Sequence, residues 1–170
     1  MTGPSTEPPA GPSTGPAALV VHVAAWDELT PRQLHDILKL RVDVFVVEQE
    51  CAYPELDGRD VEPATEHVWT ADGAGPTAYL RVLREGTGDG DGAARRVGRV
   101  CTRKDARGSG LAAELVADVL RRHGSGVVVL DAQSYLVGWY ERYGFAATGP
   151  EYLDDGIPHV PMRRPRGVSA

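Results

Sequence analysis

Between residues 96 and 132 the sequence reads as a strand, a basic turn with glycines, a helix and a second strand, and this unit constrains the fold most. The β-branched stretch 96–102 predicts a strand, and the apolar spacing of 109–123 predicts a helix. The continuous apolar run 126–132 is typical of a strand buried at the centre of a sheet. With further strands before it, the unit predicts a mixed α/β sheet.

The remaining elements are predicted from periodicity and turn residues. Further strands are expected at 17–25, 66–72, 77–85 and 157–164. Further helices are expected at 30–49 and 135–145. Thr30 and Pro31 supply the cap and the first position of the earlier helix, and Gly144 ends the later one. Pro158 and Pro161 would confine the last strand to an edge of the sheet.

The length of 170 residues suits one domain with its own core. Residues 1–17 are nearly all proline, glycine, serine, threonine and alanine, with no large apolar side chain, so we expect a disordered tail. The domain is expected to span 18–164, followed by a short tail at 165–170. Within it, the glycine- and aspartate-rich stretch 86–94 predicts a flexible connection.

Composition and charge argue against several classes of function. The net charge of −6 disfavours broad nucleic-acid binding, which requires a basic face. No apolar run is long enough to span a membrane and no signal peptide is visible, so we expect a cytoplasmic protein with no membrane partner. Cys51 and Cys101 are then expected as free thiols, and the scattered histidines offer no metal site.

The turn before the helix 109–123 is a candidate anion site. A helix N-terminus offers unpaired N–H groups and a positive dipole end. The basic residues around it are Arg95, Arg96, Arg99, Arg103, Lys104 and Arg107. One interpretation is a dinucleotide site, since Gly108-x-Gly110-x-x-Ala113 matches the Rossmann fingerprint. Against it, several residues separate Gly108 from the preceding strand, and too little chain follows Asp131 to complete a doubly wound sheet.

A second register of this stretch, Arg107-x-x-Gly110-x-Ala112, resembles the acyl-CoA motif of the GNAT superfamily of N-acetyltransferases. The segment QSYLVGWYERYGF resembles a second motif of that superfamily, with Gln133 at an asparagine position and Tyr140 at a tyrosine position. The stretches LKLRVDVFVVEQECAYPELDGRD and DGIPHVPMRR are similar to its ElaA-like branch. The resemblance covers roughly residues 30–164.

The resemblance implies the acyl-CoA N-acyltransferase fold, an α/β (α+β) fold. Its central sheet is mixed and mostly antiparallel, with splayed middle strands and flanking helices. It also implies acetyl-CoA as donor and the amine of a small molecule or protein as acceptor. The residues implied to bind acetyl-CoA are Val100, Cys101, Thr102, Arg107, Gly108, Ser109, Gly110, Leu111, Ala112, Ala113 and Gln133.

Acetyl transfer to an amine requires an acid for the departing thiolate and a base for the protonated amine. Tyr140 is the expected acid, because a phenol stays protonated at neutral pH. His67 is the expected base, because imidazole changes charge in the neutral range. The other candidate bases are Glu48, Glu66 and His159, of which Glu48 and His159 are also expected to bind the acceptor. The acidic loop 50–62 would attract a cationic amine.

Three alternatives stay open at this level. An acyl-enzyme could form on Cys101, although the sequence shows no base beside it. The chain could bind acyl-CoA without catalysis. It could also act like an acyl-homoserine-lactone synthase, because the stretch RVDVFVVEQ is similar to an early helix of that related family. Either a monomer or a homodimer is expected.

Overall fold

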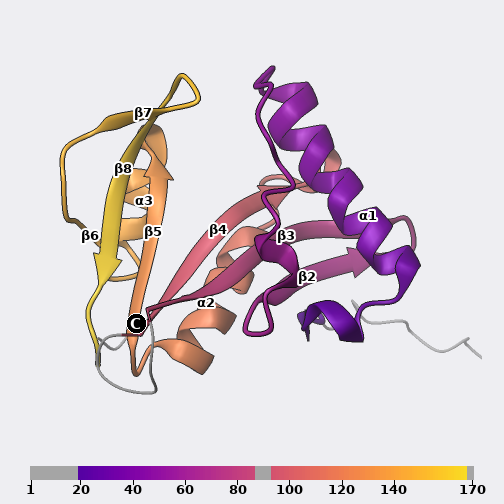
Figure 1. The fold of residues 1–170 in the computed structure, drawn as a ribbon, viewed down its shortest axis with the longest axis horizontal. Helices are drawn as coiled ribbons and strands as arrows, with labels where there is room; N and C mark the ends of the chain where they lie inside the picture. The colour runs from indigo at the N-terminus through magenta and orange to yellow at the C-terminus, as the bar shows by residue number, and fades with distance from the viewer. Residues whose placement is uncertain (1–18, 87–92, 168–170) are drawn as a thin grey trace, which may run out of the picture.

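The computed structural model describes residues 19–86 and 93–167, so the predicted tail 1–17 and most of the predicted connection 86–94 lie outside the described residues. In the described part, one sheet runs in the order β1-β2-β3-β4-β5-β8-β6, and β7 also pairs with β8 (Figure 1). The strands are β1 (His22–Ala24), β2 (Glu66–Asp72), β3 (Gly75–Glu85), β4 (Ala94–Thr102), β5 (Val127–Gln133), β6 (Ala146–Ala147), β7 (Tyr152–Asp154) and β8 (Ile157–Arg164). Only β4 and β5 pair in parallel among these, which confirms the predicted mixed, mostly antiparallel sheet.

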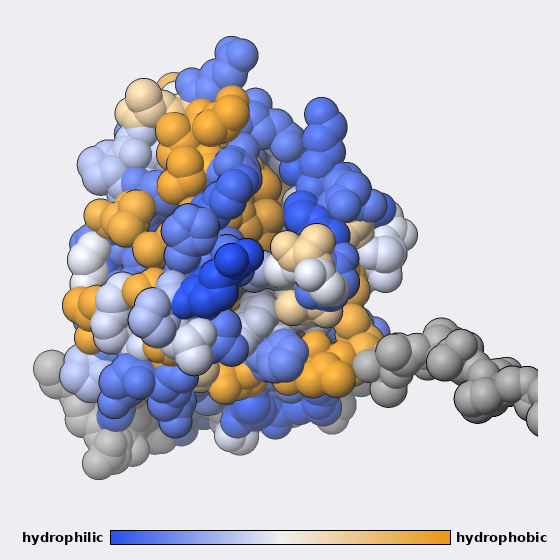
Figure 2. Space-filling model, turned by 90° about the vertical axis from the view of Figure 1, so that its right-hand side faces the viewer, coloured by the Kyte–Doolittle hydropathy of each residue, from blue (hydrophilic) through white to orange (hydrophobic). Residues whose placement is uncertain are grey.

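Helices cover both faces of the sheet. α1 (Pro31–Arg41) packs on one face, and α2 (Leu111–His123) and the short α3 (Val137–Glu141) pack on the other. Alternation along β2 divides the core, since Val68 belongs to the apolar cluster under α2 and Trp69 to the cluster under α1. The side of the molecule viewed in Figure 2 shows hydrophilic and apolar areas interspersed.

The helix predicted at 30–49 is present over nearly all of that range. Thr30 Oγ1 accepts a hydrogen bond from Gln33 N (3.2 Å), and the Gln33 side chain accepts one from Thr30 N (2.9 Å), which forms a capping box. After α1 the helix widens into π-helical turns, η2 (Val42–Glu48), in which Gln49 N donates to Val44 O (3.2 Å). Such turns are common near functional sites.

Two predicted elements are shorter in the structure. Of the strand predicted at 17–25, residues 17 and 18 lie outside the described residues, and in the described part only His22–Ala24 pairs with β2. The chain then enters a 3-10 turn, where Ala25 N donates to the Glu28 carboxylate (2.7 Å). The helix predicted at 135–145 begins as a 3-10 turn at Ser134–Leu136, and its α-helical part is only α3. Gly144, with φ +82°, ends this segment as predicted.

The prediction that prolines confine the strand 157–164 to a sheet edge is wrong. β8 lies between β5 on one side and the short strands β6 and β7 on the other. Pro161 O accepts from Thr148 N (2.8 Å) on the outer side, and the N and O atoms of one strand residue point the same way. The nitrogen of Pro161 therefore faces the break between β6 and β7. No strand among the described residues lies there that would need a hydrogen bond from it, so the lack of an N–H group has no cost.

Candidate active site

The centre of the sheet opens where β4 and β5 meet. These strands pair only through Ala94–Arg96 and Val127–Val129, and they diverge beyond those residues (Figure 1). The predicted splay of the middle strands is therefore confirmed. Along the rest of β4, the side that faces β5 has no strand partner among the described residues, so its backbone groups are available to a bound molecule.

A bulge in β4 lies within the same opening. Tyr79 of β3 pairs with Cys101, whereas Arg81 pairs with Gly98, so β4 contains one residue more than β3 over this stretch. Arg99 lies inside the bulge and has φ +54°, a left-handed backbone conformation that residues other than glycine, asparagine and aspartate seldom adopt. Bulges change the direction in which side chains point, and they recur beside active sites.

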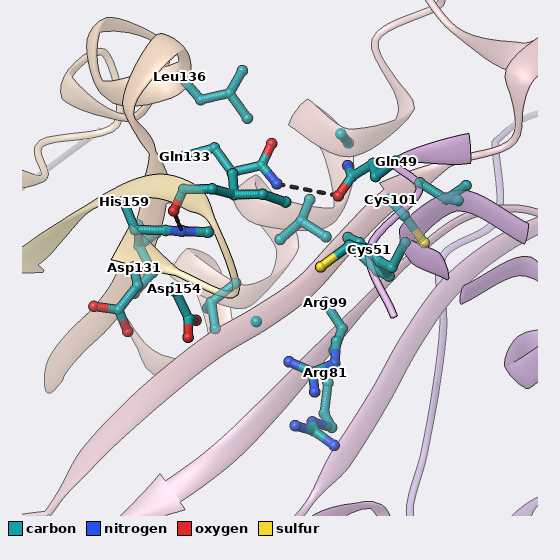
Figure 3. Close-up of a pocket in the computed structure, with 18 of the residues that line it drawn as sticks. Gln49, Cys51, Arg81, Arg99, Cys101, Asp131, Gln133, Leu136, Asp154 and His159 are labelled. Carbon is teal, nitrogen blue, oxygen red and sulfur yellow. Dashed lines mark hydrogen bonds between the residues drawn. The ribbon is translucent and has the colours of Figure 1, made fainter. Parts of the chain in front are cut away.

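A cavity of about 590 Å³ occupies the gap between the separated strands. Its walls come from β4 and β5, the end of η2 with the loop after it, and the β7–β8 turn (Figure 3). The cavity is lined by many of the residues that the sequence predicts to bind the cofactor, bind the acceptor or act in catalysis. These residues are Glu48, Val100, Cys101, Thr102, Arg107, Ala112, Gln133, Tyr140 and His159.

A groove of about 340 Å³ lies at the N-terminus of α2 and adjoins the cavity, because Thr102, Arg107 and Ala112 line both. The other predicted cofactor residues that line the groove are Gly108, Gly110, Leu111 and Ala113. Gly108 and Gly110 have φ values of +79° and +81°, which explains why glycine occupies both positions. Gly110 is the helix cap and offers no capping side chain, so the first N–H groups of α2 remain available to an anion.

Ser109 lines neither hollow, and its hydroxyl donates to the backbone carbonyl of Ala106. The structure therefore gives its side chain a local role in holding the turn that precedes α2. The backbone N–H of Ser109 stays among the groups expected to bind an anion at this turn.

The basic run around the junction is largely neutralised. Arg107 donates to both carboxylate oxygens of Glu48 (2.6 and 2.9 Å) and from Nε to Thr102 O (3.1 Å). The hydrogen bond from Arg107 lowers the pKa of Glu48 below its usual range. Arg103 pairs with Asp72 at 2.6 Å, and Arg96 pairs with Glu85 at 2.5 Å. With these three arginines paired, the backbone N–H groups at the N-terminus of α2 remain available to an anion.

Tyr140 projects from α3 into the cavity. Its ring packs edge-on against Trp139 (centroids 4.7 Å apart) and Phe145 (5.9 Å), and the residue is 4% exposed. Within residues 19–86 and 93–167 no hydrogen bond engages its hydroxyl. Burial raises the pKa of Tyr140 well above its usual range, so the phenol carries its proton throughout the neutral range.

The structure places His67 outside the cavity, under α1. The residue is fully buried, and both ring nitrogens are engaged, Nδ1 with the Tyr79 hydroxyl (2.8 Å) and Nε2 with Asp60 O (3.1 Å). Burial lowers the pKa of His67. This placement does not fit the prediction that His67 removes a proton from the acceptor, because no cavity surface reaches its ring.

His159 of β8 does line the cavity, beside Gln133 of the neighbouring strand (Figure 3). His159 Nδ1 lies 2.9 Å from Ile157 O. A carbonyl only accepts hydrogen bonds, so Nδ1 carries the proton and Nε2 holds a free lone pair. The Gln133 side chain donates to Gln49 Oε1 (3.4 Å), which connects β5 to the end of η2 across the cavity.

Cys101 reaches the cavity but is only 4% exposed. Burial raises the pKa of its thiol to about 12. The thiolate form that an acyl-enzyme route needs is therefore scarce at neutral pH. Cys51 also lines the cavity, and both cysteines are free.

An ion-pair network that the sequence did not reveal ties the loop 50–62 to the sheet. Its carboxylates are Glu55, Asp57 and Asp60, and its arginines are Arg41, Arg81 and Arg99. The fully buried Arg41 alone contacts Glu55 at 2.5 Å and Asp60 at 2.6 Å. The acidic loop is therefore neutralised internally rather than free to attract a cationic amine. The one sequence signal was an arginine, Arg81, within an otherwise apolar strand.

In residues 19–86 and 93–167, no group of histidine, cysteine, aspartate and glutamate side chains could hold a metal ion. In the same part of the chain, none of the helices has the length and apolarity needed to cross a membrane.

A mixed sheet that opens between its parallel central strands, beside a glycine-rich helix N-terminus, defines a protein of the acyl-CoA N-acyltransferase fold. The chain belongs to the GNAT acetyltransferase family, because the model of the acetyltransferase (GNAT) domain matches residues 36–165.

Relatives and solved structures agree with this assignment. The chain is 50% identical over 140 residues to a UPF0039 protein of Mycobacterium tuberculosis, and the aligned region covers 81% of this chain and 88% of that protein. It is 35% identical over 143 residues to protein ElaA of Escherichia coli, covering 81% of this chain and 90% of ElaA. The crystal structure of an acyl-CoA N-acyltransferase from Pseudomonas aeruginosa superposes with a TM-score of 0.77 at 38% identity, covering 86% of this chain and 99% of that chain.

Proposed function

We propose that this chain transfers an acetyl group from acetyl-CoA directly to the amine of an acceptor. The observation that carries the proposal is the junction of cavity and groove, which share Thr102, Arg107 and Ala112. Acetyl-CoA carries its thioester at one end of a long arm and its pyrophosphate near the other end. It therefore requires a narrow opening for the arm and an adjoining anion site for the pyrophosphate. The groove supplies N–H groups for the pyrophosphate, and the opening supplies the unpaired strand for the pantetheine arm.

The backbone does most of the donor binding in this proposal. The N–H groups that would hold the pyrophosphate belong to Gly108, Ser109, Gly110, Leu111, Ala112 and Ala113. Val100, Cys101 and Thr102 would bind the pantetheine amides and polarise the thioester carbonyl. The Gln133 side chain would contact the same arm. This division explains why glycine and alanine occupy positions 108, 110, 112 and 113 at the groove.

Tyr140 is the proposed acid. When the amine nitrogen bonds to the acetyl carbon, the carbon–sulfur bond breaks and the sulfur needs a proton. The phenol of Tyr140 has its proton and no competing partner in the described residues, so it donates to that sulfur. The products are an N-acetylated amine and the free thiol of CoA.

His159 takes the place of His67 as the proposed base. An amine arrives as an ammonium ion and must lose a proton before it attacks. His159 lines the cavity, and with Nδ1 donating to Ile157 O its Nε2 is the nitrogen left to accept a proton. Replacing His159 with glutamine removes this lone-pair base, and turnover is expected to fall more than acetyl-CoA affinity does.

The test is a thiol-release assay of the full chain with acetyl-CoA and a panel of amines, alongside calorimetry with CoA and with NAD. Binding of CoA with amine-dependent thiol release supports the proposal. Binding of NAD with no response to CoA would overturn it and restore the dinucleotide interpretation. We also propose a cytoplasmic location, which the free cysteines Cys51 and Cys101 support.

A further inference from the structure

Two arginines on the sheet wall of the cavity belong to no step of the proposed reaction. Arg81 lies on β3 and Arg99 in the bulge of β4, and both line the cavity (Figure 3). Both contact the same carboxylate oxygen, Asp57 Oδ2, Arg81 at 2.6 Å and Arg99 at 3.4 Å, so the guanidinium groups lie close together. Arg99 also lies over the Tyr53 ring, 5.4 Å from its centroid.

Arg81 retains a buried donor with no acceptor. The Nε of Arg81, on a side chain that is 3% exposed, makes no hydrogen bond within the described residues. The Nε of Arg99 lies 2.5 Å from Glu55 Oε2 as an ion pair, but its direction does not form a hydrogen bond. Buried donors are nearly always satisfied in folded proteins, so the Arg81 donor at this cavity wall indicates a ligand with acceptor oxygens.

The opposite wall of the cavity carries the opposite charge. Asp131 of β5 and Asp154 of β7 lie across from the two arginines (Figure 3). Asp131 is paired with Arg96, whereas Asp154 forms no ion pair within the described residues. Among the lining residues, the wall at β3 and β4 holds two guanidinium groups that share Asp57, and the wall at β5 and β7 holds the carboxylates of Asp131 and Asp154. A molecule with both an amine and an anionic group matches that arrangement.

We propose that the acceptor is an amino acid, an amine that also carries a carboxylate, and that Arg99 and Arg81 bind the carboxylate. This inference rests on the acyl transfer proposed above. Guanidinium groups bind carboxylates through paired, charge-assisted hydrogen bonds. Arg99 directly precedes Val100, Cys101 and Thr102, so a carboxylate bound there holds its amine close to the thioester carbonyl. The bulge explains how a β4 side chain can reach this position.

The test compares matched ligands and matched variants of the full chain. Calorimetry of the CoA-loaded protein with lysine against cadaverine, and with phenylalanine against phenethylamine, measures what the carboxylate contributes. Arg99→Asn is the informative variant, because asparagine tolerates φ +54°. Arg99→Lys retains the charge, and Arg103→Gln removes a paired arginine that lies outside the cavity. Melting temperature and CoA affinity report whether each variant is intact.

The amino acid of at least one pair should bind about tenfold to hundredfold more tightly than its decarboxylated partner. Arg99→Asn should remove that preference and raise KM for the amino acid more than it lowers kcat, with Arg99→Lys intermediate and Arg103→Gln unchanged. Equal binding within both pairs would overturn the inference. Thiol release with the decarboxylated amines alone would leave acyl transfer standing without the carboxylate site. Amino-acid binding that depends on Arg99, with no thiol release, would support the site and overturn the proposed function.

Discussion

Arg107 and Glu48 form a two-pronged ion pair between the start of the α2 junction and the end of η2, at 2.6 and 2.9 Å. The two residues are far apart in the sequence, and both line the cavity. Arg107 also lines the groove, so the Glu48 carboxylate competes with any anion that approaches the guanidinium there. Both side chains are partly exposed, so the pair can open at modest cost.

Replacing Glu48 with glutamine should therefore tighten CoA binding. The substitution removes the competing charge and keeps the shape of the side chain, and exposed ion pairs of this kind are weak. The expected gain in CoA affinity is about two- to fivefold, measured by calorimetry. Asp43→Asn is the matched control, because Asp43 lies on the same η2 segment and pairs only with the exposed Lys39. Weaker CoA binding in Glu48→Gln would show that Glu48 orients Arg107 rather than competing for it.

Tyr140→Phe should lower kcat by about 10²- to 10⁴-fold in any working acceptor assay, because it removes the proposed acid. Acetyl-CoA affinity should change little, since backbone N–H groups are proposed to hold the donor. Stability should change by less than about 1 kcal/mol, since the hydroxyl has no partner to lose among the described residues. Tyr143→Phe is the control, because Tyr143 packs on the same Trp139 but does not line the cavity. Normal kcat in Tyr140→Phe would assign the proton to water or to another residue.

Much of the fold was predictable because its signals are local. The periodicity of 96–132 depends on nearby residues, and so does the cap formed by Thr30 with Gln33. The position of β8 was not predictable, because edge or centre depends on which strands pair with it. The prolines restrict only one side of that strand, and the chain leaves a break beside Pro161.

The candidate site divides in the same way. Small residues such as Gly110 and the spacing of Tyr140 pointed to the groove and the cavity, because those features lie within short motifs. The buried position of His67 under α1 could not be predicted from the sequence. Periodicity shows that the side chains of a strand alternate between two faces, but not which face opens to a cavity. The sequence groups Arg99 with the basic residues around the α2 junction, but its place in the cavity wall depends on a bulge that is defined by pairing with β3.

Arg41→Met should destabilise the protein strongly. Arg41 is fully buried and neutralises Glu55 and Asp60, so its loss leaves carboxylates buried with fewer partners. Removing one partner of a buried ion pair typically costs about 3–5 kcal/mol in the free energy of unfolding. Urea denaturation measures the change. Arg32→Met is the control, since Arg32 forms an exposed helical pair with Asp36 and its loss should change the stability far less than the loss of Arg41. A similar loss in both variants would contradict a structural role for the network.

The buried His67 should make the protein less stable as the pH falls below neutral. Burial lowers the folded-state pKa of His67 below its unfolded value of about 6.5, so in acid the unfolded chain binds a proton that the folded chain resists. This contribution to stability is present in full above pH 7. It is lost progressively as the pH falls from about 6.5 to the lowered pKa of the folded state.

Melting temperatures between pH 7.5 and 5 should therefore fall more steeply for the wild type than for His67→Gln, which keeps an amide in place of the ring but cannot titrate. The other histidines are common to both proteins, so the difference between the two slopes isolates His67. Identical slopes would mean that the ring takes up its proton equally well in the folded chain, contrary to the effect of its complete burial.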